Sequence, residues 1–215
     1  FEGELTIDYR LKNKLSNWSK NNFGSLCNFT GGGTPSKKHK NYWNGDINWA
    51  SIKDIKGNYL TTTRDKISKH GLDNSSAKIA KKGELIIGTR INPGRPIITK
   101  IDTSINQDLK IARPKEKLNI KFLFYLFKQK ENQILNVSNG TTVLGINLSN
   151  LNEITFEYPN SVKEQQQIVQ EIEYQFSICD ALEENINKGL QQAKSLKQSI
   201  LKKAFEGKLL SQDEL

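Results

Sequence analysis

Residues 163–205 read KEQQQIVQEIEYQFSICDALEENINKGLQQAKSLKQSILKKAF, and this stretch decides the architecture of the chain. It contains no proline and one glycine. Hydrophobic or small residues recur along it at steps of three and four, the repeat of one face of an α-helix. We call these residues the helix stripe: Ile172, Phe176, Cys179, Leu182, Ile186, Leu190, Ala193, Leu196, Ile200 and Ala204. At 1.5 Å per residue, a helix over this stretch is roughly 60 Å long.

A helix of that length cannot bury its stripe against one small domain, so the sequence predicts a partner helix and a coiled coil. The stripe, with Cys179 as a small buried hydrophobe, is interpreted as a packing seam and not as a cofactor site. Ser161 and Glu164 have the spacing of a capping box, and Gly207 is placed to end the helix. We therefore expect the helix at about 161–206.

Residues 15–160 show a different pattern, in which short apolar runs are separated by Gly, Pro, Asn and Asp. The expected strands are 47–52, 83–89, 96–101, 105–112 and 151–158, and one short helix is expected at 120–134. In the last strand, Ile154, Phe156 and Tyr158 share one face. The predicted fold class is therefore α+β: a globular domain of mixed strands and short helices, followed by one long coiled-coil-forming helix.

The excess positive charge of the chain lies entirely in its first part. The 215 residues carry 32 Lys and Arg against 23 Asp and Glu, a net charge of +9. Residues 161–215 hold seven of those cations and nine of those acids, so they carry −2 and residues 1–160 carry +11. This asymmetry favours a polyanionic partner for the first part alone. A basic surface without any partner is the other interpretation.

Composition excludes several classes of protein. With 35% hydrophobic and 26% charged residues the chain is not mainly disordered, and no stretch approaches 18 apolar residues, so no membrane span is expected. The first residues lack a secretory signal, and Cys27 and Cys179 lie far apart, so a reduced, cytoplasmic protein is expected. Because methionine is absent and the sequence starts at Phe1, we expect further residues upstream.

The sequence contains no catalytic, cofactor or metal motif. Residues 91–94 read Ile-Asn-Pro-Gly, which lacks the second proline and the aromatic residue of an amino-methyltransferase motif. The glycine run at 31–33 is not followed by the Gly-Lys-Ser/Thr of a phosphate-binding loop. His39 and His70 have no second ligand at metal-binding spacing. We therefore expect no enzymatic activity, no cofactor and no metal.

Three polar segments are candidates for contacts to nucleic acid. Lysines and backbone amides hold phosphates, Arg and Asn form bidentate contacts to guanine and adenine, and hydroxyls beside a flexible glycine suit a phosphate. The candidate residues are Lys37, Lys38, His39 and Lys40 in one loop, Arg90, Asn92 and Arg95 in a turn between two expected strands, and Thr141 and Thr142 after Gly140. The simpler alternatives are a solvated charge run for the loop and phosphate contacts alone for the two arginines.

The order of segments along the chain resembles the specificity subunits of Type I restriction–modification enzymes. The resemblance is carried by residues 32–36, 42–49, 67–72, 75–77, 82–87, 106–107, 122–126 and 140–142. Glu164-Gln165 with Ile168-Val169 opens the long helix in the manner of that family. The pentamer Phe-Glu-Gly-Glu-Leu at 1–5 also recurs as Phe-Glu-Gly-Lys-Leu at 205–209, so Phe1 is expected to end a preceding long helix.

The resemblance implies a non-catalytic subunit that reads one half of a bipartite target in double-stranded DNA and docks the methylation and restriction subunits of a prokaryotic system. It also implies one half-unit of that subunit. Residues 1–14 would be the tail of a preceding helix and a linker, 15–160 the target-recognition domain, and 161–215 the spacer helix with a C-terminal tail. The helix would pair with another copy or with a second half-unit. The chain departs from the family in holding one recognition domain instead of two.

Two interpretations from other classes stay open at this point. The chain could be a coiled-coil scaffold whose head binds protein, which salt-dependent DNA affinity would exclude. It could also be an enzyme, such as a nuclease or methyltransferase, fused to a coiled coil. Incubation with DNA, magnesium and a methyl donor would identify that enzyme.

Overall fold

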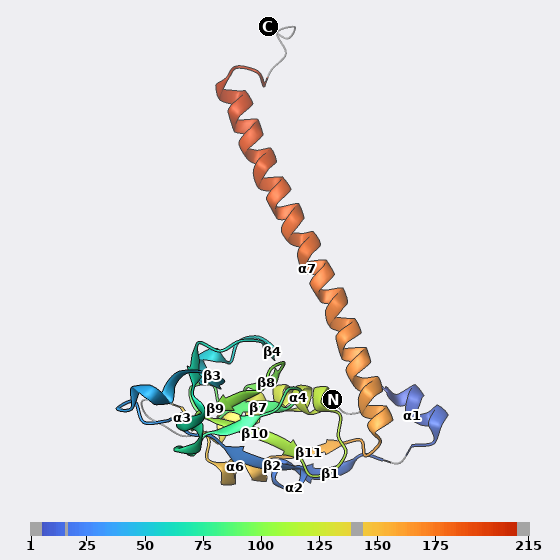
Figure 1. The fold of residues 1–215 in the computed structure, drawn as a ribbon. Coiled ribbons are helices and arrows are strands. Elements are labelled where there is room, and N and C mark those ends of the chain that lie inside the picture. Colours follow the sequence, from blue (N-terminus) through green and yellow to red (C-terminus); the bar gives the residue numbers. More distant parts are fainter. Residues whose placement is uncertain (1–5, 16, 139–143, 210–215) are drawn as a thin grey trace. The chain divides into compact units, whose positions relative to one another are not determined.

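The computed structural model describes residues 6–15, 17–138 and 144–209. By its internal contacts the chain divides into two compact units, Phe1–Val169 and Gln170–Leu215. All the strands of the described residues lie in the first unit, and the second unit is built on one helix (Figure 1). None of the described helices is both long and apolar enough to cross a membrane. The three-part division at residues 14 and 160 stays a prediction.

Three sheets form the framework of the first unit, and nearly all neighbouring strands run antiparallel. The five-stranded sheet has the order β2 (Cys27–Gly31), β10 (Leu109–Pro114), β7 (Leu85–Gly88), β8 (Pro96–Thr99) and β4 (Tyr59–Leu60). The four-stranded sheet has the order β5 (Asp65–Ile67), β3 (Trp43–Ala50), β9 (Thr103–Ile105) and β6 (Lys78–Ala80), and β1 (Ser19–Asn22) pairs with β11 (Thr155–Tyr158). Only the pairs β3–β9 and β4–β8 among these are parallel.

Short helices join these strands and one long helix follows them. They are α1 (Ile7–Asn13), α2 (Phe23–Leu26), α3 (Lys69–Asp73), α4 (Ile120–Gln129), α5 (Glu131–Asn136), α6 (Leu148–Glu153) and α7 (Val162–Phe205), with 3-10 turns η2 (Lys40–Tyr42) and η3 (Ile52–Asp54). The mixture of sheets and short helices before one long helix confirms the predicted α+β class.

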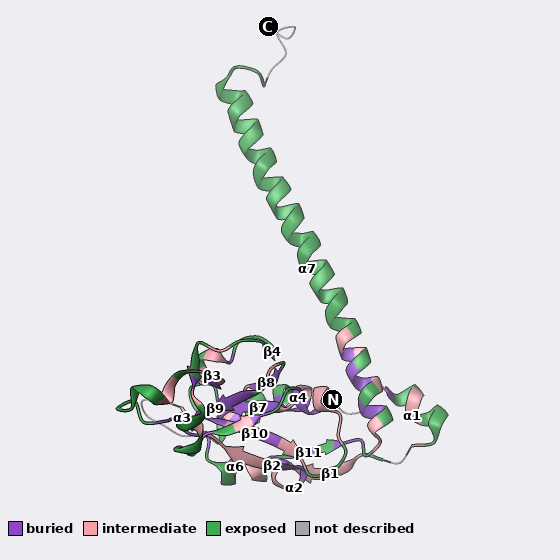
Figure 2. Ribbon diagram, viewed as in Figure 1, coloured by how far each residue is buried: buried purple, intermediate pink, exposed green. Residues whose placement is uncertain are grey.

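The main core lies between the two larger sheets because their β-branched residues face each other. Ile86, Ile97 and Ile111 of the five-stranded sheet share a cluster with Ile105 of β9, and all four are completely buried. In Figure 2 the buried residues of these strands are purple. Helix α4 packs through aromatic rings, since Phe127 stacks on Phe23 at 4.1 Å between ring centroids.

Two of the predicted elements are wrong because side-chain hydrogen bonds interrupt them. The expected strand 105–112 is two strands in different sheets, separated by a turn in which Asn106 Oδ1 accepts the Asp108 N–H at 3.1 Å. The expected strand 151–158 begins instead as α6, whose N-cap Asn147 accepts the Asn150 N–H at 2.7 Å. Its second half is strand β11, and the three residues expected on one face, Ile154, Phe156 and Tyr158, are all buried.

Smaller differences concern element ends. The expected helix 120–134 is split at Lys130, which caps α4 and precedes α5. The expected strand 47–52 starts earlier, at Trp43, and ends at Ala50, after which Ile52 belongs to η3. The expected strands 83–89 and 96–101 correspond to β7, which is shorter at both ends, and to β8, which starts at Pro96 as expected and ends at Thr99.

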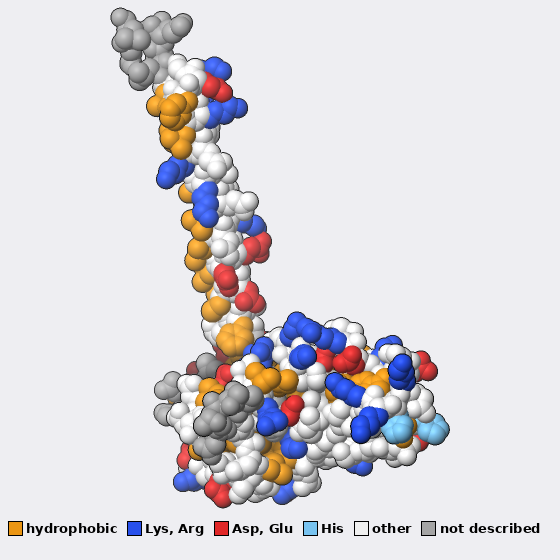
Figure 3. All heavy atoms as spheres, turned by 90° about the vertical axis from the view of Figure 1, so that its left-hand side faces the viewer, with side chains coloured by type: hydrophobic (Ala, Val, Ile, Leu, Met, Phe, Trp, Pro, Cys, Tyr) orange, Lys and Arg blue, Asp and Glu red, His pale blue; other side chains and the backbone are white. Residues whose placement is uncertain are grey.

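The long helix α7 ends where the sequence predicts. Gly207 has a φ of +68°, and the Lys208 N–H donates to the Lys203 carbonyl at 2.8 Å, which together close the helix in a left-handed cap. Beyond Ile172, which is buried, the helix stripe is exposed in the single chain, with Ile186 69% exposed. Cys179 is also exposed, so the expectation of a buried cysteine is not met in the single chain. Figure 3 shows the hydrophobic side chains as a line along α7.

The start of α7 holds two buried polar side chains, Glu164 and Gln165, both about 1% exposed. The Gln165 amide accepts the Asn119 N–H at 2.9 Å and donates to the Pro159 carbonyl at 2.9 Å. The capping box is only half formed. The Glu164 N–H donates to Ser161 Oγ at 3.4 Å, but the Glu164 carboxylate turns away from the cap.

That carboxylate joins the N-terminal segment to the start of α7. Glu164 Oε1 accepts hydrogen bonds from Trp18 Nε1 at 2.8 Å and Thr6 Oγ1 at 3.2 Å, and it lies 3.4 Å from Arg10 Nε. Glu164 and Gln165 therefore have a structural role, because each side chain forms hydrogen bonds with polar groups that an apolar residue would leave without a partner.

We expect Glu164→Ala to lower the free energy of unfolding by about 2–4 kcal/mol, because it leaves the Trp18 and Thr6 donors without their acceptor and the Arg10 guanidinium without its ion-pair partner. Urea unfolding followed by tryptophan fluorescence measures the change. The matched control is Glu183→Ala, whose side chain is exposed on α7 and should change stability by less than about 0.5 kcal/mol. Equal effects of the two substitutions would contradict a structural role for the Glu164 cluster.

Candidate nucleic-acid interface

The turn between β7 and β8, residues 89–95, carries three of the candidate residues. Backbone hydrogen bonds close it, from the Gly94 N–H to the Gly88 carbonyl at 2.8 Å and from the Gly88 N–H to the Arg95 carbonyl at 3.0 Å. Gly94 has a φ of +83°, and a Cβ atom there would lie 2.6 Å from the Ile134 side chain. The turn is therefore seated on α5 at a position that only glycine fits.

A second segment of the chain holds the same turn from the side. The Ile91 N–H donates to the Leu144 carbonyl at 2.8 Å, and the Ile146 N–H donates to the Thr89 carbonyl at 2.9 Å. Between them, Arg90 and Gly145 pair as an isolated antiparallel β-bridge. The structure thus brings residues 144–146 to the turn, which the sequence did not predict. Thr141 and Thr142 precede this segment but lie outside the described residues.

The polar side chains of the turn differ in their exposure and in their contacts. Arg90 is exposed and lies 3.7 Å from Asp108 Oδ1, so one carboxylate already faces it. Asn92 is exposed and Arg95 is half-buried. Arg and Asn side chains on a turn fixed at both ends can present planar donors in a constant orientation, which is what bidentate contact to a base edge requires.

A basic tract continues from this turn along the five-stranded sheet. Burial lowers the pKa of Lys128 on α4, and the positive charge of nearby Arg95 lowers it further. Lys128 Nζ donates to Asn58 Oδ1 at 2.9 Å, and Lys100 Nζ lies 4.2 Å from the centre of the Tyr59 ring. Sequence reasoning missed these four residues, Asn58, Tyr59, Lys100 and Lys128, because they are scattered along the chain and only the fold brings them together.

Next to Tyr59 lies a hollow of about 240 Å³ that is lined by cations and hydroxyls. Its lining includes Lys53, Lys56, Arg64 and the threonines 61–63. The acid in the lining, Asp54, already accepts the Arg64 N–H at 3.0 Å and the Ser51 N–H at 2.8 Å. Cations with hydroxyl donors suit the phosphates of a nucleic-acid backbone. On the face shown in Figure 3, many Lys and Arg side chains lie on the first unit, with acidic side chains between some of them.

The lysine-rich loop belongs to the other large sheet. Lys37, Lys38, His39 and Lys40 are all exposed, and they lie just before or at the start of η2. The tryptophans behind the loop hold it in place, since Trp49 Nε1 donates to the Gly33 carbonyl at 3.0 Å and Trp43 Nε1 to the Ser36 carbonyl at 3.4 Å. The side chains of the loop are therefore exposed, while its backbone is held by these two hydrogen bonds. The loop belongs to a different sheet from the β7–β8 turn.

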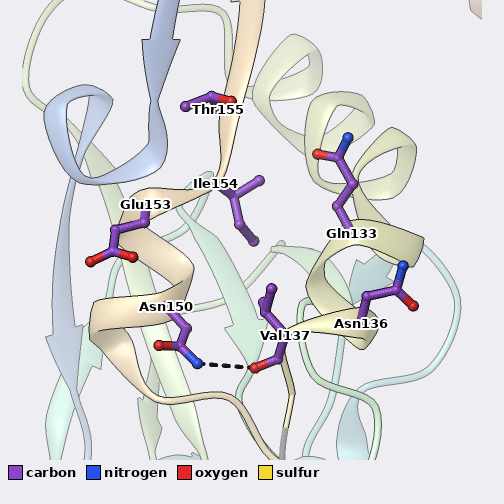
Figure 4. Close-up of a pocket in the computed structure, with 7 residues that line it drawn as sticks. All are labelled: Gln133, Asn136, Val137, Asn150, Glu153, Ile154 and Thr155. Carbon is purple, nitrogen blue, oxygen red and sulfur yellow. Dashed lines mark hydrogen bonds between the residues drawn. The ribbon is translucent and has the colours of Figure 1, made fainter.

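The hollow with the largest volume described, about 690 Å³, is a poor candidate for nucleic acid (Figure 4). It is lined by Gln133, Asn136, Val137, Asn150, Glu153, Ile154 and Thr155. Within this lining, the Asn150 side chain donates to the Val137 carbonyl at 3.0 Å. Its lining contains no cation and one carboxylate, so it would repel a phosphate.

No group of three His, Cys, Asp or Glu side chains arranged to hold a metal ion occurs within residues 6–15, 17–138 and 144–209. Cys27 is buried, and burial raises the pKa of its thiol to about 12, so it is not a nucleophile at neutral pH. The cations and hydroxyls of the β7–β8 turn and of the hollow beside Tyr59 are suited to binding an anion.

Comparisons with known proteins agree with that chemistry. The family model described as "Type I restriction modification DNA specificity domain" matches residues 15–192. The chain is similar to the Type I restriction enzyme MjaIX specificity subunit of Methanocaldococcus jannaschii, with 31% identity over 162 residues that make up 73% of this chain and 37% of the relative. It is also similar to the EcoR124I/EcoR124II specificity subunit of Escherichia coli, with 26% identity over 91% of this chain and 52% of the relative.

The fold is shared with solved structures. The crystal structure of the HsdS subunit from Thermoanaerobacter tengcongensis superposes with a TM-score of 0.66 at 22% identity, covering 90% of this chain and 46% of that chain. A structure described as the basis of complex assembly and conformational transition of the type I R-M system gives a TM-score of 0.73 at 22% identity, covering 97% of this chain and 53% of that one. The chain thus spans between a third and about half of the length of these proteins.

Proposed function

The chain belongs to the family of Type I restriction modification DNA specificity domains, and from that premise we propose that it reads one half of a bipartite target in double-stranded DNA. It would act without catalysing a reaction, as the specificity part of a system whose methylation and restriction subunits do the chemistry. Docking of those subunits and a prokaryotic cytoplasmic location belong to the same proposal. Its relatives are described as specificity subunits, which favours this function over a protein-binding scaffold.

The observation that carries the proposal is the β7–β8 turn with its Arg90, Asn92 and Arg95 side chains. The turn is fixed by two strands and by residues 144–146, so ordering it on DNA costs little conformational entropy. We propose Arg95 and Asn92 as readers of base edges. Thr141 and Thr142 are proposed as phosphate contacts.

Contacts to the DNA backbone are proposed for the lysine-rich loop on the other large sheet. The exposed loop of Lys37, Lys38, His39 and Lys40 would hold phosphates as flexible point charges. Exposed lysine side chains that contact phosphates contribute affinity and salt dependence to DNA binding but little sequence preference.

Selection from a pool of duplexes with a randomised central segment tests the function. We expect the chain to enrich one short contiguous motif, because one recognition domain reads one half-site. The retained DNA should be neither cleaved nor methylated when magnesium and a methyl donor are added. A pool that stays random after repeated capture would contradict sequence reading, and modified DNA would support the enzyme alternative.

We propose further that α7 pairs through the helix stripe with a second copy of itself or with a second half-unit. Leu182, Ile186, Leu190 and Leu196 are each more than half exposed in the single chain, which is costly for a helix in water. An antiparallel, isologous pair would cover both stripes and would place the two recognition domains at opposite ends.

We expect the chain to form a dimer in light scattering at micromolar concentration and Leu190→Lys to be monomeric, because the lysine places a charge in the seam. Gln192→Lys, which adds the same charge on the opposite side of α7, should remain dimeric. Alkylation of the thiols gives a second readout, since Cys179 should react slowly in the dimer and rapidly in Leu190→Lys. Cys27, which is buried and has its pKa raised to about 12, should stay unreactive in both. A helical wild-type monomer with rapidly reacting Cys179 would contradict the pairing.

A further inference from the structure

Ile91, at the tip of the β7–β8 turn, has a backbone conformation that its side chain disfavours. Its φ is +67°, in the left-handed region that glycine adopts readily and that β-branched residues almost never occupy. The residue is the centre of a tight γ-turn, because the Asn92 N–H donates to the Arg90 carbonyl at 2.8 Å. The strain is held in place from outside the turn by the bond from the Ile91 N–H to the Leu144 carbonyl.

Packing within the chain does not explain why this position is isoleucine. The Ile91 side chain is 55% exposed, whereas Ile86 and Ile97 on the adjoining strands are completely buried. Glycine or asparagine would adopt the same backbone with less strain. A strained backbone that carries an exposed apolar group is typical of a functional contact.

The neighbours of Ile91 indicate what that contact is. Arg90 precedes it and Asn92 follows it, and both side chains are exposed. Arg95 lies four residues further on, at the base of the same turn. The apolar tip is thus surrounded by side chains suited to base edges, so its partner is an apolar group that lies among hydrogen-bonding groups. In the major groove of DNA that group is the C5-methyl of thymine.

We propose that Ile91 is a specificity-determining residue that packs on the C5-methyl group of one thymine in the half-site. This inference rests on the proposed function and adds to it a base that the polar readers do not identify. It requires that the selected motif contain a thymine on one strand.

The test replaces each thymine of the selected duplex, one at a time, by deoxyuridine, which lacks only the methyl group. For the wild-type chain we expect one position at which affinity falls roughly three- to tenfold, as burial of one methyl group predicts. For Ile91→Ala the same replacement should have no effect, since the contact is already lost. Ile91→Val keeps a branched apolar side chain and should keep most of the sensitivity.

Ile91→Gly separates this role from a structural one. Because glycine relieves the backbone strain, we expect its thermal unfolding midpoint to rise by about 2–4 °C while the sensitivity to the thymine methyl disappears. A purely structural isoleucine would give a lower midpoint and unchanged methyl sensitivity.

Two results would overturn the inference while leaving the proposed function intact. One is a selected duplex that shows no loss at any deoxyuridine position, and the other is an equal loss in wild type and Ile91→Ala. If instead the chain bound selected and scrambled duplexes equally, the proposed function would fail and the inference with it. The affinity ratio of the wild-type chain for the selected over the scrambled duplex therefore distinguishes the two failures.

Discussion

The affinity of the chain for duplex DNA is expected to fall roughly 100- to 1000-fold between 50 and 200 mM salt, if about four to six phosphates are neutralised. The first 160 residues carry a net charge of +11, and their cations gather over the first unit (Figure 3). Each phosphate contact releases a condensed counterion, so the slope of log affinity against log salt counts the contacts. Fluorescence anisotropy with a labelled duplex at several salt concentrations measures it.

The lysine-rich loop is expected to account for part of that slope. Replacing Lys37, Lys38 and Lys40 together by Gln should flatten the slope by about two to three contacts and leave the preference for the cognate duplex unchanged. The matched control removes three charges from α7 by replacing Lys194, Lys197 and Lys203 by Gln, and it should leave the slope unaltered. An unchanged slope in the loop variant would show that the loop faces away from DNA. The hollow of Lys53, Lys56 and Arg64 would then be the next set to replace.

Arg95→Ala and Asn92→Ala are each expected to cost about 1–3 kcal/mol of discrimination, a loss of roughly 5- to 150-fold in preference for the cognate duplex. Arg95 is held at the base of a turn that two strands and residues 144–146 fix, so its guanidinium is presented in a constant orientation. An acceptor-rich guanine edge there would be held by two parallel hydrogen bonds from the guanidinium. Binding to a scrambled duplex at the same salt should change little.

The control for this prediction is Arg64→Ala in the cation-lined hollow. It removes the same side chain from a site suited to phosphates, so it should weaken cognate and scrambled binding equally. If Arg95→Ala and Asn92→Ala also weakened both duplexes equally, the turn would contact phosphates alone and would not be the reader.

The long helix was predictable because its signals are local. The three- and four-residue steps and the glycine that ends the helix are both read from consecutive residues, and α7 runs from Val162 to Phe205. Other elements had signals that pattern reading missed. Asn147 precedes α6 as an N-cap, and Asn106 forms the turn that divides the expected strand 105–112. Hydrophobic alternation alone cannot detect such hydrogen bonds.

The candidate site was only half predictable. Arg90, Asn92 and Arg95 stand close together in the sequence, so their turn could be found. Lys100 directly follows strand β8 and Lys128 lies on helix α4, and residues 144–146 bond to the turn across more than fifty positions of chain. Glu164 is similar, since its donors Thr6 and Trp18 lie about 150 residues away. Contacts of this range follow from tertiary packing and leave no local pattern.

The central claim is that this chain reads a DNA sequence, and the most direct test is the ratio of two dissociation constants. The wild-type chain is titrated against the selected duplex and against a scrambled duplex of the same length and composition, at one fixed salt concentration. We predict a preference for the selected duplex of about tenfold or more, because base contacts add to a phosphate term that both duplexes share. A ratio of one would contradict the account, since the chain would then bind DNA by charge alone.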